Sequence, residues 1–542
     1  MVSGAWAGAS LVPGDDAKVN VADKAGSDVR GTRTARATAT PAADPPSATA
    51  DAPAPPPDPS SLAEGEVLAG AAKTSIKPRP EEYSGTWETS EEKCATLSEH
   101  GAERLVTDAA EMGDHLAAAG SPWPENPNCI YMGGFGIGPM NPVTSWDDEL
   151  GLWVRAVALR DSQGDDLVLV ILDGEGYFWD YASKCADCGI KQITADLAGD
   201  ESLGLEAEDI VISATHAHSS PDFIGGWGFV PNWYMHQMRD TIKSTIREAL
   251  ADMQPAELEY GEHEAREYNS ERRDTYRSAE EQQLVWLRAY AAKGRSDTIA
   301  TIGAYAAHPT AFGTNGGKAH PDWPGLFEAR LEERFGGVGM HFMTGLGNVS
   351  NSGLGQAEKT HNLADLVEGV GDGNVIEQPD IKTARTTWAQ PATNVPLTAL
   401  GTPGFFDRKF QQSPATVRTG EDPDKFQCVS ASPTAVEVAA SAARIGPEVA
   451  LTAAPGEIFS NFSNTIKEKS GAEATMPLGQ ANDALGYMPQ SFEMSQVGQQ
   501  GPGFVGEVQG YAVINYEDAY AIDKCFGDMT LETSIGLLNG LK

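Results

Sequence analysis

The chain has few basic residues for its size and no long apolar run. Lys and Arg number 39 against 77 Asp and Glu in 542 residues, which gives a formal net charge of −38. This charge repels the phosphates of nucleic acids and the headgroups of anionic lipids, so we expect no nucleic-acid partner. No segment approaches the roughly 20 apolar residues that a membrane-spanning helix needs, so we expect no transmembrane segment. The hydrophobic fraction of 40% is nevertheless enough for a sizeable core.

Cysteine is also scarce, but the number of cysteines is even. The six are Cys94, Cys129, Cys185, Cys188, Cys428 and Cys525. An even number favours disulfides in an exported protein, so we predict disulfide bonds and a secreted, extracellular location, with the pairing left open. Cys185 and Cys188 are closely spaced, which in a cytosolic protein would indicate a redox or metal pair. A second pair of this kind, as a structural zinc site would need, is missing.

Residues 1–80 lack the periodic apolar pattern of a folded domain. The stretch is rich in Ala, Pro, Asp and Thr, as in ATATPAADPPSATADAPAPPPDPSS. Such a composition buries too little apolar surface to offset the entropy lost when a chain becomes ordered. We therefore predict a disordered tail over residues 1–80 and one catalytic domain over residues 81–542.

Short apolar runs alternate with helical patterns beyond residue 80. Strands are predicted over residues 166–173, 209–215, 298–307, 338–345 and 448–454, and helices over residues 232–253, 324–335 and 434–445. The strand segments are short and buried in character, whereas the helical segments repeat their apolar residues at helical spacing. This alternation predicts an α/β fold in which helices flank a central β-sheet.

Reactive side chains follow four of the predicted strands. His216 and His218 end the strand over 209–215, and His308 follows the strand over 298–307. Ser350 comes after the strand over 338–345, and Glu457 after the strand over 448–454. Sites in α/β proteins gather outside the carboxyl ends of strands, so we expect these side chains to converge.

The two closely spaced histidines could serve one metal ion. Residues i and i+2 of an extended segment point the same way, so His216 and His218 can face one site. Taken alone, the spacing fits an exposed strand end with two solvated histidines better than a metal site. His308 and Glu457 favour a metal site over a solvated strand end, because two imidazoles and a carboxylate are the protein ligands of many hydrolytic zinc sites. The pattern therefore predicts a Zn²⁺ cofactor.

Ser350 lies in the glycine-rich turn GLGNVSNSG, residues 345–353. This turn is not the GxSxG elbow of an α/β-hydrolase, and no Ser-His-Asp triad can be identified from the sequence. A catalytic serine and an ordinary turn both remain open.

Seven short motifs occur in an order that resembles the neutral/alkaline ceramidase family of zinc amidohydrolases. They are ISATHAHSSPD, YAAHPTAFG, HPDWPG, GLGNVSN, APGEIF, NDALGYMP and INYED. The resemblance implies a hydrolase that cleaves the amide bond of ceramide, an amphiphilic N-acyl lipid, to a fatty acid and sphingosine. An amidase or esterase for another acylated metabolite, and a binding protein without turnover, are the alternatives. The chain ends soon after INYED, so we do not expect the C-terminal immunoglobulin-like domain of many family members.

The resemblance also implies a set of metal ligands. His216, His308 and Glu457 would bind zinc, and Tyr487 of NDALGYMP would be a phenolic fourth ligand. His218 would remain off the metal, as a hydrogen-bond donor or proton carrier near the substrate carbonyl.

Two further positions are implied less directly. The family turn around the serine usually reads Gly-Asp-Val-Ser-Pro-Asn, whereas this chain has Asn348 and Asn351 on either side of Ser350. The family's active-site arginine corresponds to Arg272 or Arg273 of YNSERRDTY. Because the two are adjacent, the spacing does not show which of them it is. We therefore expect Ser350 and one of the two arginines at the catalytic site.

Overall fold

The described part of the chain is a layered α/β structure. The computed structural model describes residues 58–542, apart from 64, 95–127, 136–140, 274–279, 293–296, 395–396, 399–406, 421–426, 495–506, 509–510 and 513–515. The α/β class predicted from the sequence is confirmed. Residues 1–57 of the predicted tail lie outside the described residues.

The main sheet has nine strands and is mixed. In spatial order they are β11 (Val338–Met343), β9 (Thr298–Tyr305), β8 (Gln283–Ala291), β6 (Gln254–Glu264), β1 (Val67–Ser75), β3 (Trp153–Arg160), β4 (Asp166–Leu172) and β5 (Ile210–Ala214), with β13 (Asn374–Val375) paired to β6. The pairs β4–β5 and β9–β11 are parallel. β9 approaches β1, and β11 approaches β4, although other strands separate them in the sheet order, so the sheet is strongly curved.

A second sheet packs against the main sheet. It contains β14 (Ile381–Pro391), β18 (Ala435–Ile445), β19 (Val449–Ala453) and β21 (Ala474–Leu478) in this order, with β15 (Phe410–Gln411) paired to β18. One apolar cluster joins the two sheets and includes Leu169, Ile302 and Met340 of the main sheet with Leu451 and Met476 of the second. Burial of this shared core stabilises the contact between the sheets.

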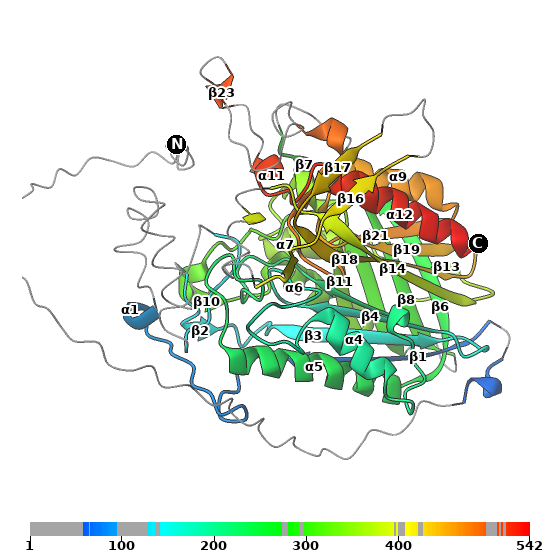
Figure 1. Ribbon diagram of the computed structural model, residues 1–542. Helices are drawn as coiled ribbons and strands as arrows, with labels where there is room; N and C mark the ends of the chain where they lie inside the picture. Colours follow the sequence, from blue (N-terminus) through cyan, green and yellow to red (C-terminus); the bar gives the residue numbers. More distant parts are fainter. Residues whose placement is uncertain are drawn as a thin grey trace, which may run out of the picture. The chain divides into compact units, whose positions relative to one another are not determined.

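Helices cover the outer faces of both sheets (Figure 1). α4 (Ile190–Ala198) and α5 (Asn232–Ala251) pack on the main sheet, where α5 lies along β1 and β3. α6 (Asp322–Phe335) packs on β11 and α7 (Ala357–Ala364). α9 (Ser460–Ser470) and α12 (Phe526–Gly540) cover the second sheet.

Several short elements complete the described structure. The strands are β2 (Ser145–Trp146), β7 (Asn269–Glu271), β10 (Lys318–Ala319), β12 (Val349–Asn351), β16 (Ala415–Arg418), β17 (Val429–Ser432), β20 (Glu457–Ile458), β22 (Tyr487–Met488), β23 (Glu507–Val508) and β24 (Tyr511–Ala512). The helices are α1 (Glu91–Cys94), α11 (Tyr516–Ala519) and the 3-10 turns η1 (Pro59–Ser61), η2 (Ala207–Asp209), η3 (Asn315–Gly317), η4 (Leu346–Asn348) and η5 (Ser491–Glu493). Within the described residues, no helix combines the length and apolar character needed to cross a membrane.

Two predictions from the sequence are wrong. Residues 434–445, predicted as a helix, form strand β18, because β14 and β19 pair with it on both sides and its alanines fit a position between two packed layers. Tertiary pairing outweighs the helical preference of alanine here. The predicted domain boundary at residue 80 is also wrong, because β1 lies between β3 and β6 in the main sheet.

The cysteines form three disulfides. Cys94 pairs with Cys129, Cys185 with Cys188, and Cys428 with Cys525. The predicted disulfide chemistry is confirmed, and the pairing that the sequence left open is resolved.

Candidate active site

His216 follows β5 in a strained backbone conformation. Its φ is 57°, in the left-handed region that non-glycine residues seldom adopt. The buried ring turns its Nδ1 toward the carbonyl oxygen of Glu175, at 2.7 Å. Glu175 itself follows β4, the strand that pairs with β5. The strain and this hydrogen bond together fix the orientation of the imidazole.

His218 and His308 are held in the same way. His218 Nδ1 lies 3.0 Å from the carbonyl oxygen of Gly134, and His308 Nδ1 lies 3.1 Å from that of Leu346. A carbonyl oxygen only accepts hydrogen bonds, so each Nδ1 carries the proton and donates it. In the neutral rings, each Nε2 is therefore left with a free lone pair.

These lone pairs and one carboxylate oxygen meet at a single point. The ligand nitrogens of His216, His218 and His308 all lie within 4.8 Å of one another. Glu457 Oε2, from β20, lies 3.6 Å from His216 Nε2 and 3.4 Å from His308 Nε2. The two histidines that end separate strands and the glutamate after β19 thus converge, as their positions at strand ends predicted.

The donor set fits a metal ion. His308 Nε2 and Glu457 Oε2 are buried, and neither has a hydrogen-bond partner among the described residues. His216 Nε2 and His218 Nε2 face each other at 3.2 Å, although neither carries a proton in the tautomers above. Buried acceptors without a donor are costly, and a cation between them removes that cost. Two imidazoles and a carboxylate are also a common protein ligand set for zinc.

The electrostatics of the site keep its histidines neutral. Burial lowers the pKa of His216 to about 4, and it lowers the pKa values of His218 and His308 well below the usual range. Burial raises the pKa of Glu457 to about 8, against the opposing effects of Arg272 and a hydrogen bond from Tyr487. The imidazoles are thus in the protonation state that metal ligation requires.

Arg272 lies at this site, whereas Arg273 points elsewhere. Arg272 Nη2 donates to the Tyr487 hydroxyl at 2.9 Å, and its Nε donates to Glu517 at 2.9 Å. Arg273 is buried, pairs with Asp518 at 3.3 Å and lies over the ring of Phe459. The structure therefore identifies Arg272 as the arginine at the site, which the sequence left undecided between Arg272 and Arg273.

The turn η4 contacts three segments of the site through successive residues. The carbonyl of Leu346 accepts from His308, and that of Gly347 accepts from Arg272 Nη2 at 2.9 Å. The Asn348 side chain accepts from the backbone N–H of Ser460 at 2.7 Å and donates to Glu271 at 2.5 Å. The GLGNVSN motif thus has a structural explanation: it joins the segments that carry His308, Arg272 and Glu457.

Ser350 is close to the site through its backbone. It forms an isolated parallel bridge with His308 and pairs with Ser270 of β7. Within the described residues, no hydrogen bond joins the Ser350 hydroxyl to an imidazole. Asn351 donates to the carbonyl oxygen of His308 at 2.9 Å and so supports that histidine instead.

Three residues near the histidines were missed by the sequence reasoning. Glu175 orients His216, Gly134 orients His218, and the ring of Phe135 lies edge-on to the His218 ring with centroids 5.2 Å apart. Glu175 is the third residue after the end of β4, so the strand-end criterion applied to the other residues would have found it. Phe223 and Phe229, which follow His218 in the sequence, have buried side chains and belong to the protein interior.

Gly134 offers a first test of the site geometry. Its φ is +82°, and a Cβ atom there would overlap the His218 ring. We expect Gly134→Ala to displace His218 and to lower turnover by roughly tenfold to 100-fold. This approaches the effect of losing a general acid or base completely. Gly164→Ala is the matched control, because Gly164 has a φ of +92° and no neighbouring atom within 4 Å. Equal turnover in the two variants would contradict the assigned contact.

Comparisons with known proteins identify the fold. No protein-family model matches the sequence, and no curated protein matches it significantly. Among solved structures, the chain is similar to the neutral ceramidase from Pseudomonas aeruginosa, with a TM-score of 0.57 and 16% identity over 88% of this chain and 75% of that chain. A structure of ceramidase complexed with C2 matches with the same TM-score of 0.57 and 16% identity, over 88% and 74%. The resemblance stated from the sequence is thus confirmed at the level of the fold.

Proposed function

We propose that the protein is a zinc-dependent hydrolase that cleaves the amide bond of ceramide or a similar N-acyl lipid. The observation that carries the proposal is the convergence of three imidazoles and Glu457 on one point, in a chain with the fold of neutral ceramidase. The products are a fatty acid and an amine, which is sphingosine when the substrate is ceramide.

His216, His308 and Glu457 would hold the zinc ion, with the Tyr487 phenol as the fourth donor. The bound metal would polarise the amide carbonyl as a Lewis acid and supply a nucleophilic water at neutral pH. The backbone carbonyls of Glu175 and Leu346 keep the two histidines in the tautomer that directs Nε2 to the ion.

His218 is assigned the proton transfers. It is the least buried of the three histidines, and its Nδ1 proton is bound to the Gly134 carbonyl. Its Nε2 can accept a proton from the attacking water and then donate it to the departing amine nitrogen. The same proton thus leaves with the amine product, and His218 returns to its starting tautomer.

Arg272 is assigned the stabilisation of the negative charge that develops on the substrate oxygen in the transition state, and Tyr487 helps to position its guanidinium. The guanidinium and the phenol are hydrogen-bonded to each other at 2.9 Å, and Arg272 is further fixed by Glu517 and Gly347. Donors held in place before the reaction stabilise a developing oxyanion without the cost of reorienting. Ser350 is assigned a role in shaping the site, since a nucleophilic serine requires a base within hydrogen-bond reach.

An acyl-chain series tests the substrate class. Phe135 presents an apolar ring beside His218, so we expect kcat/KM of the zinc-loaded protein to rise as the N-acyl group of sphingosine is lengthened from acetyl. The increase should reach at most roughly fourfold per methylene, because each buried methylene contributes about 0.8 kcal/mol. Release of fatty acid and free amine is measured for each chain length, and Phe135→Ala should flatten the series.

The result also separates the alternatives. A flat or falling series, with good turnover of short acyl amides or esters, would favour an amidase or esterase for a small metabolite. Lipid binding without hydrolysis of any member would favour a binding protein.

The three disulfides support a secreted enzyme. Disulfides persist in oxidising compartments and are rare where thiols are kept reduced. We therefore propose an extracellular location for the hydrolase.

A further inference from the structure

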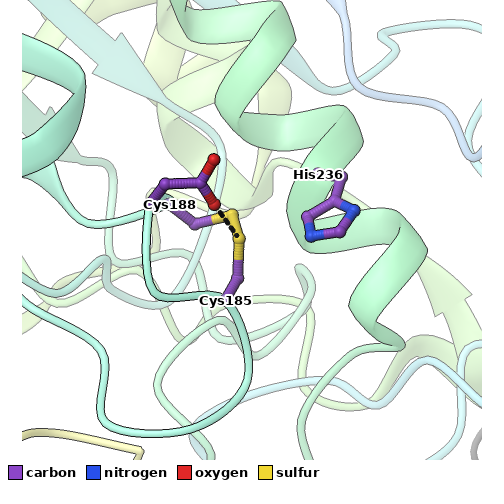
Figure 2. Close-up of side chains that lie close together, drawn as sticks. Cys185, Cys188 and His236 are labelled. Atoms are coloured by element: carbon purple, nitrogen blue, oxygen red, sulfur yellow. Dashed lines mark hydrogen bonds between the residues drawn. A yellow bond between two sulfur atoms is a disulfide. The ribbon is translucent and has the colours of Figure 1, made fainter. Parts of the chain in front are cut away.

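A second group of potential metal ligands lies between the start of α4 and the first turns of α5. Cys185 and Cys188 come from the loop before α4, and His236 comes from α5 (Figure 2). Asp187 lies between the two cysteines in the sequence. One ligand atom from each residue lies within 4.8 Å of the others. This group is separate from the histidines of the proposed active site.

The disulfide between Cys185 and Cys188 keeps this group from binding a metal. In the oxidised state neither sulfur is a thiolate, and thiolates are the sulfur ligands that zinc binds. Cys185 Sγ lies 3.1 Å from Asp187 Oδ1. The carboxylate therefore already lies beside the sulfur that would become a thiol donor on reduction.

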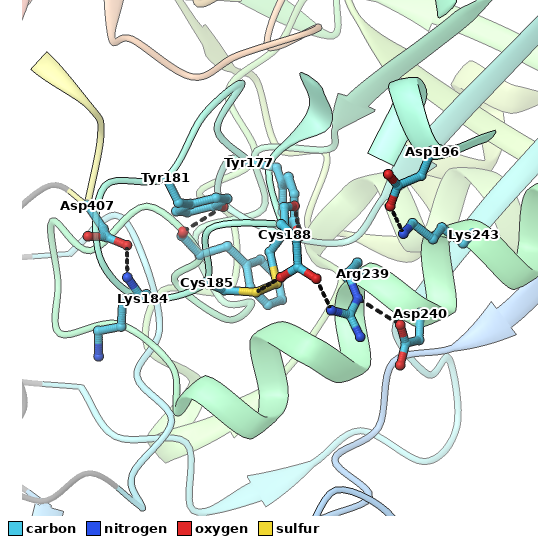
Figure 3. The surroundings of a disulfide bond; sticks show 12 residues. Tyr177, Tyr181, Lys184, Cys185, Cys188, Asp196, Arg239, Asp240, Lys243 and Asp407 are labelled. Atoms are coloured by element: carbon cyan, nitrogen blue, oxygen red, sulfur yellow. Dashed lines mark hydrogen bonds and ion pairs between the residues drawn. A yellow bond between two sulfur atoms is a disulfide. The ribbon is translucent and has the colours of Figure 1, made fainter. Parts of the chain in front are cut away.

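The loop has several attachments besides the disulfide, so its shape does not depend on the sulfur bond alone (Figure 3). The backbone N–H of Cys188 donates to the carbonyl of Cys185 at 3.2 Å, and Tyr177 donates to the carbonyl of Cys188 at 2.8 Å. Asp407 accepts from the backbone N–H of Lys184 at 2.7 Å. These hydrogen bonds hold the backbone of the loop when the disulfide is reduced, while the two sulfurs move apart from bonding distance.

α5 orients the two remaining ligands. Arg239 pairs with Asp187 Oδ2 at 2.5 Å, which leaves Oδ1 directed at Cys185. His236 lies one helical turn before Arg239 on the same helix and is partly exposed, so an ion can enter from solvent. Ligands of one zinc ion lie roughly 3.5 Å apart, so only small side-chain movements are needed to bring ligand atoms that already lie within 4.8 Å of one another onto one ion.

We propose that Cys185, Cys188, Asp187 and His236 form a second zinc site that opens when the disulfide is reduced. A dithiol reductant transfers two electrons and two protons to the disulfide, giving two cysteine thiols and the oxidised reductant. Zn²⁺ then displaces both thiol protons, and the two thiolates balance its charge. Two cysteines in C-x₂-C spacing with a histidine are typical ligands of tetrahedral zinc.

Zinc content before and after reduction tests the site. The full chain is treated with dithiothreitol, freed of reductant without oxygen, loaded with Zn²⁺ and compared with the oxidised protein by elemental mass spectrometry. We expect one additional zinc per chain after reduction, and a thiolate-to-cobalt absorption band when Co²⁺ replaces Zn²⁺. Cys185→Ser/Cys188→Ser should abolish the gain, and His236→Ala should weaken zinc affinity at least tenfold.

The Cys428–Cys525 pair supplies the control. Cys428→Ser/Cys525→Ser removes a disulfide that packs with Val417, in a different apolar cluster from Cys185, Cys188 and the buried residues of α5, and should keep the gain. Cys185→His cannot form the Cys185–Cys188 disulfide and should bind zinc at Cys188 and the two imidazoles with no reductant, even if full reduction unfolds the chain. The proposal fails if neither the reduced protein nor Cys185→His takes up more zinc than the oxidised protein, or if the gain survives in Cys185→Ser/Cys188→Ser.

Discussion

Replacing His216, His308 or Glu457 by alanine is expected to remove most of the bound metal and nearly all turnover. Each change deletes one of the proposed protein ligands, and it leaves the remaining buried acceptors unpaired. Metal per chain is measured on purified protein by elemental mass spectrometry, and turnover is measured with an N-acylsphingosine. Because the loss of metal is measured directly, the result does not depend on the choice of substrate.

His218→Ala and His361→Ala are the comparisons for these variants. His218→Ala should keep the metal and lower turnover by about two to four powers of ten, the range for loss of a general acid or base. His361 lies on α7, and within the described residues no side-chain hydrogen bond or ion pair joins it to a residue of the site, so its replacement should change neither quantity. If His218→Ala loses the metal as completely as His216→Ala, then His218 is a ligand and its assignment to proton transfer is wrong.

Asn348→Asp is expected to lower both stability and turnover, because it replaces the Asn348 nitrogen that donates to Glu271 by an oxygen. Asn348 Nδ2 donates to Glu271 Oε2 at 2.5 Å, so an aspartate would place two carboxylate oxygens against each other. Its other oxygen would still accept from Ser460 N–H, so only the Glu271 contact is lost. We expect the free energy of unfolding to fall by about 2–3 kcal/mol, typical of a lost hydrogen bond to a charged group. Turnover should fall at least roughly 100-fold, because Arg272 follows Glu271 directly and misplacement of such a group is costly.

Adding Glu271→Gln to Asn348→Asp should restore the hydrogen bond between these two positions. Glu271→Gln supplies an amide N–H that can donate to the new aspartate, so the double variant Asn348→Asp/Glu271→Gln should recover most of the stability and turnover. The pairwise interaction energy follows from urea unfolding of the two single variants, the double variant and the unmodified protein. Additive losses would mean that the Asn348–Glu271 contact does not position Arg272.

The strand-end rule predicted the convergence of the site residues from sequence. His216, His308 and Glu457 each follow an apolar run that is buried on both faces, and such runs are easily identified as strands. The rule needs no knowledge of the sheet order, because it depends only on where each chain segment leaves the core. It would also have identified Glu175.

Other features depend on contacts that sequence does not encode locally. β18 has a helical composition and becomes a strand only because β14 and β19 pair with it. β1 lies next to a Pro-rich segment, and its place between β3 and β6 depends on partners far away in the chain. Arg272 and Arg273 are chemically identical neighbours, so only the position of Tyr487 and Asp518 distinguishes them.

The curvature of the main sheet has a consequence for how the protein matures. β5 and β9 lie far apart in the sheet order, and Glu457 follows a strand of the second sheet, so the donor atoms meet only when both sheets have formed and packed. A partly folded chain therefore has no complete site, and an ion that binds only the native state shifts the folding equilibrium toward it. A chain emerging from the ribosome would stay metal-free and inert until Tyr487 had been synthesised and packed. Binding of the ion would then occur only in chains that have folded completely.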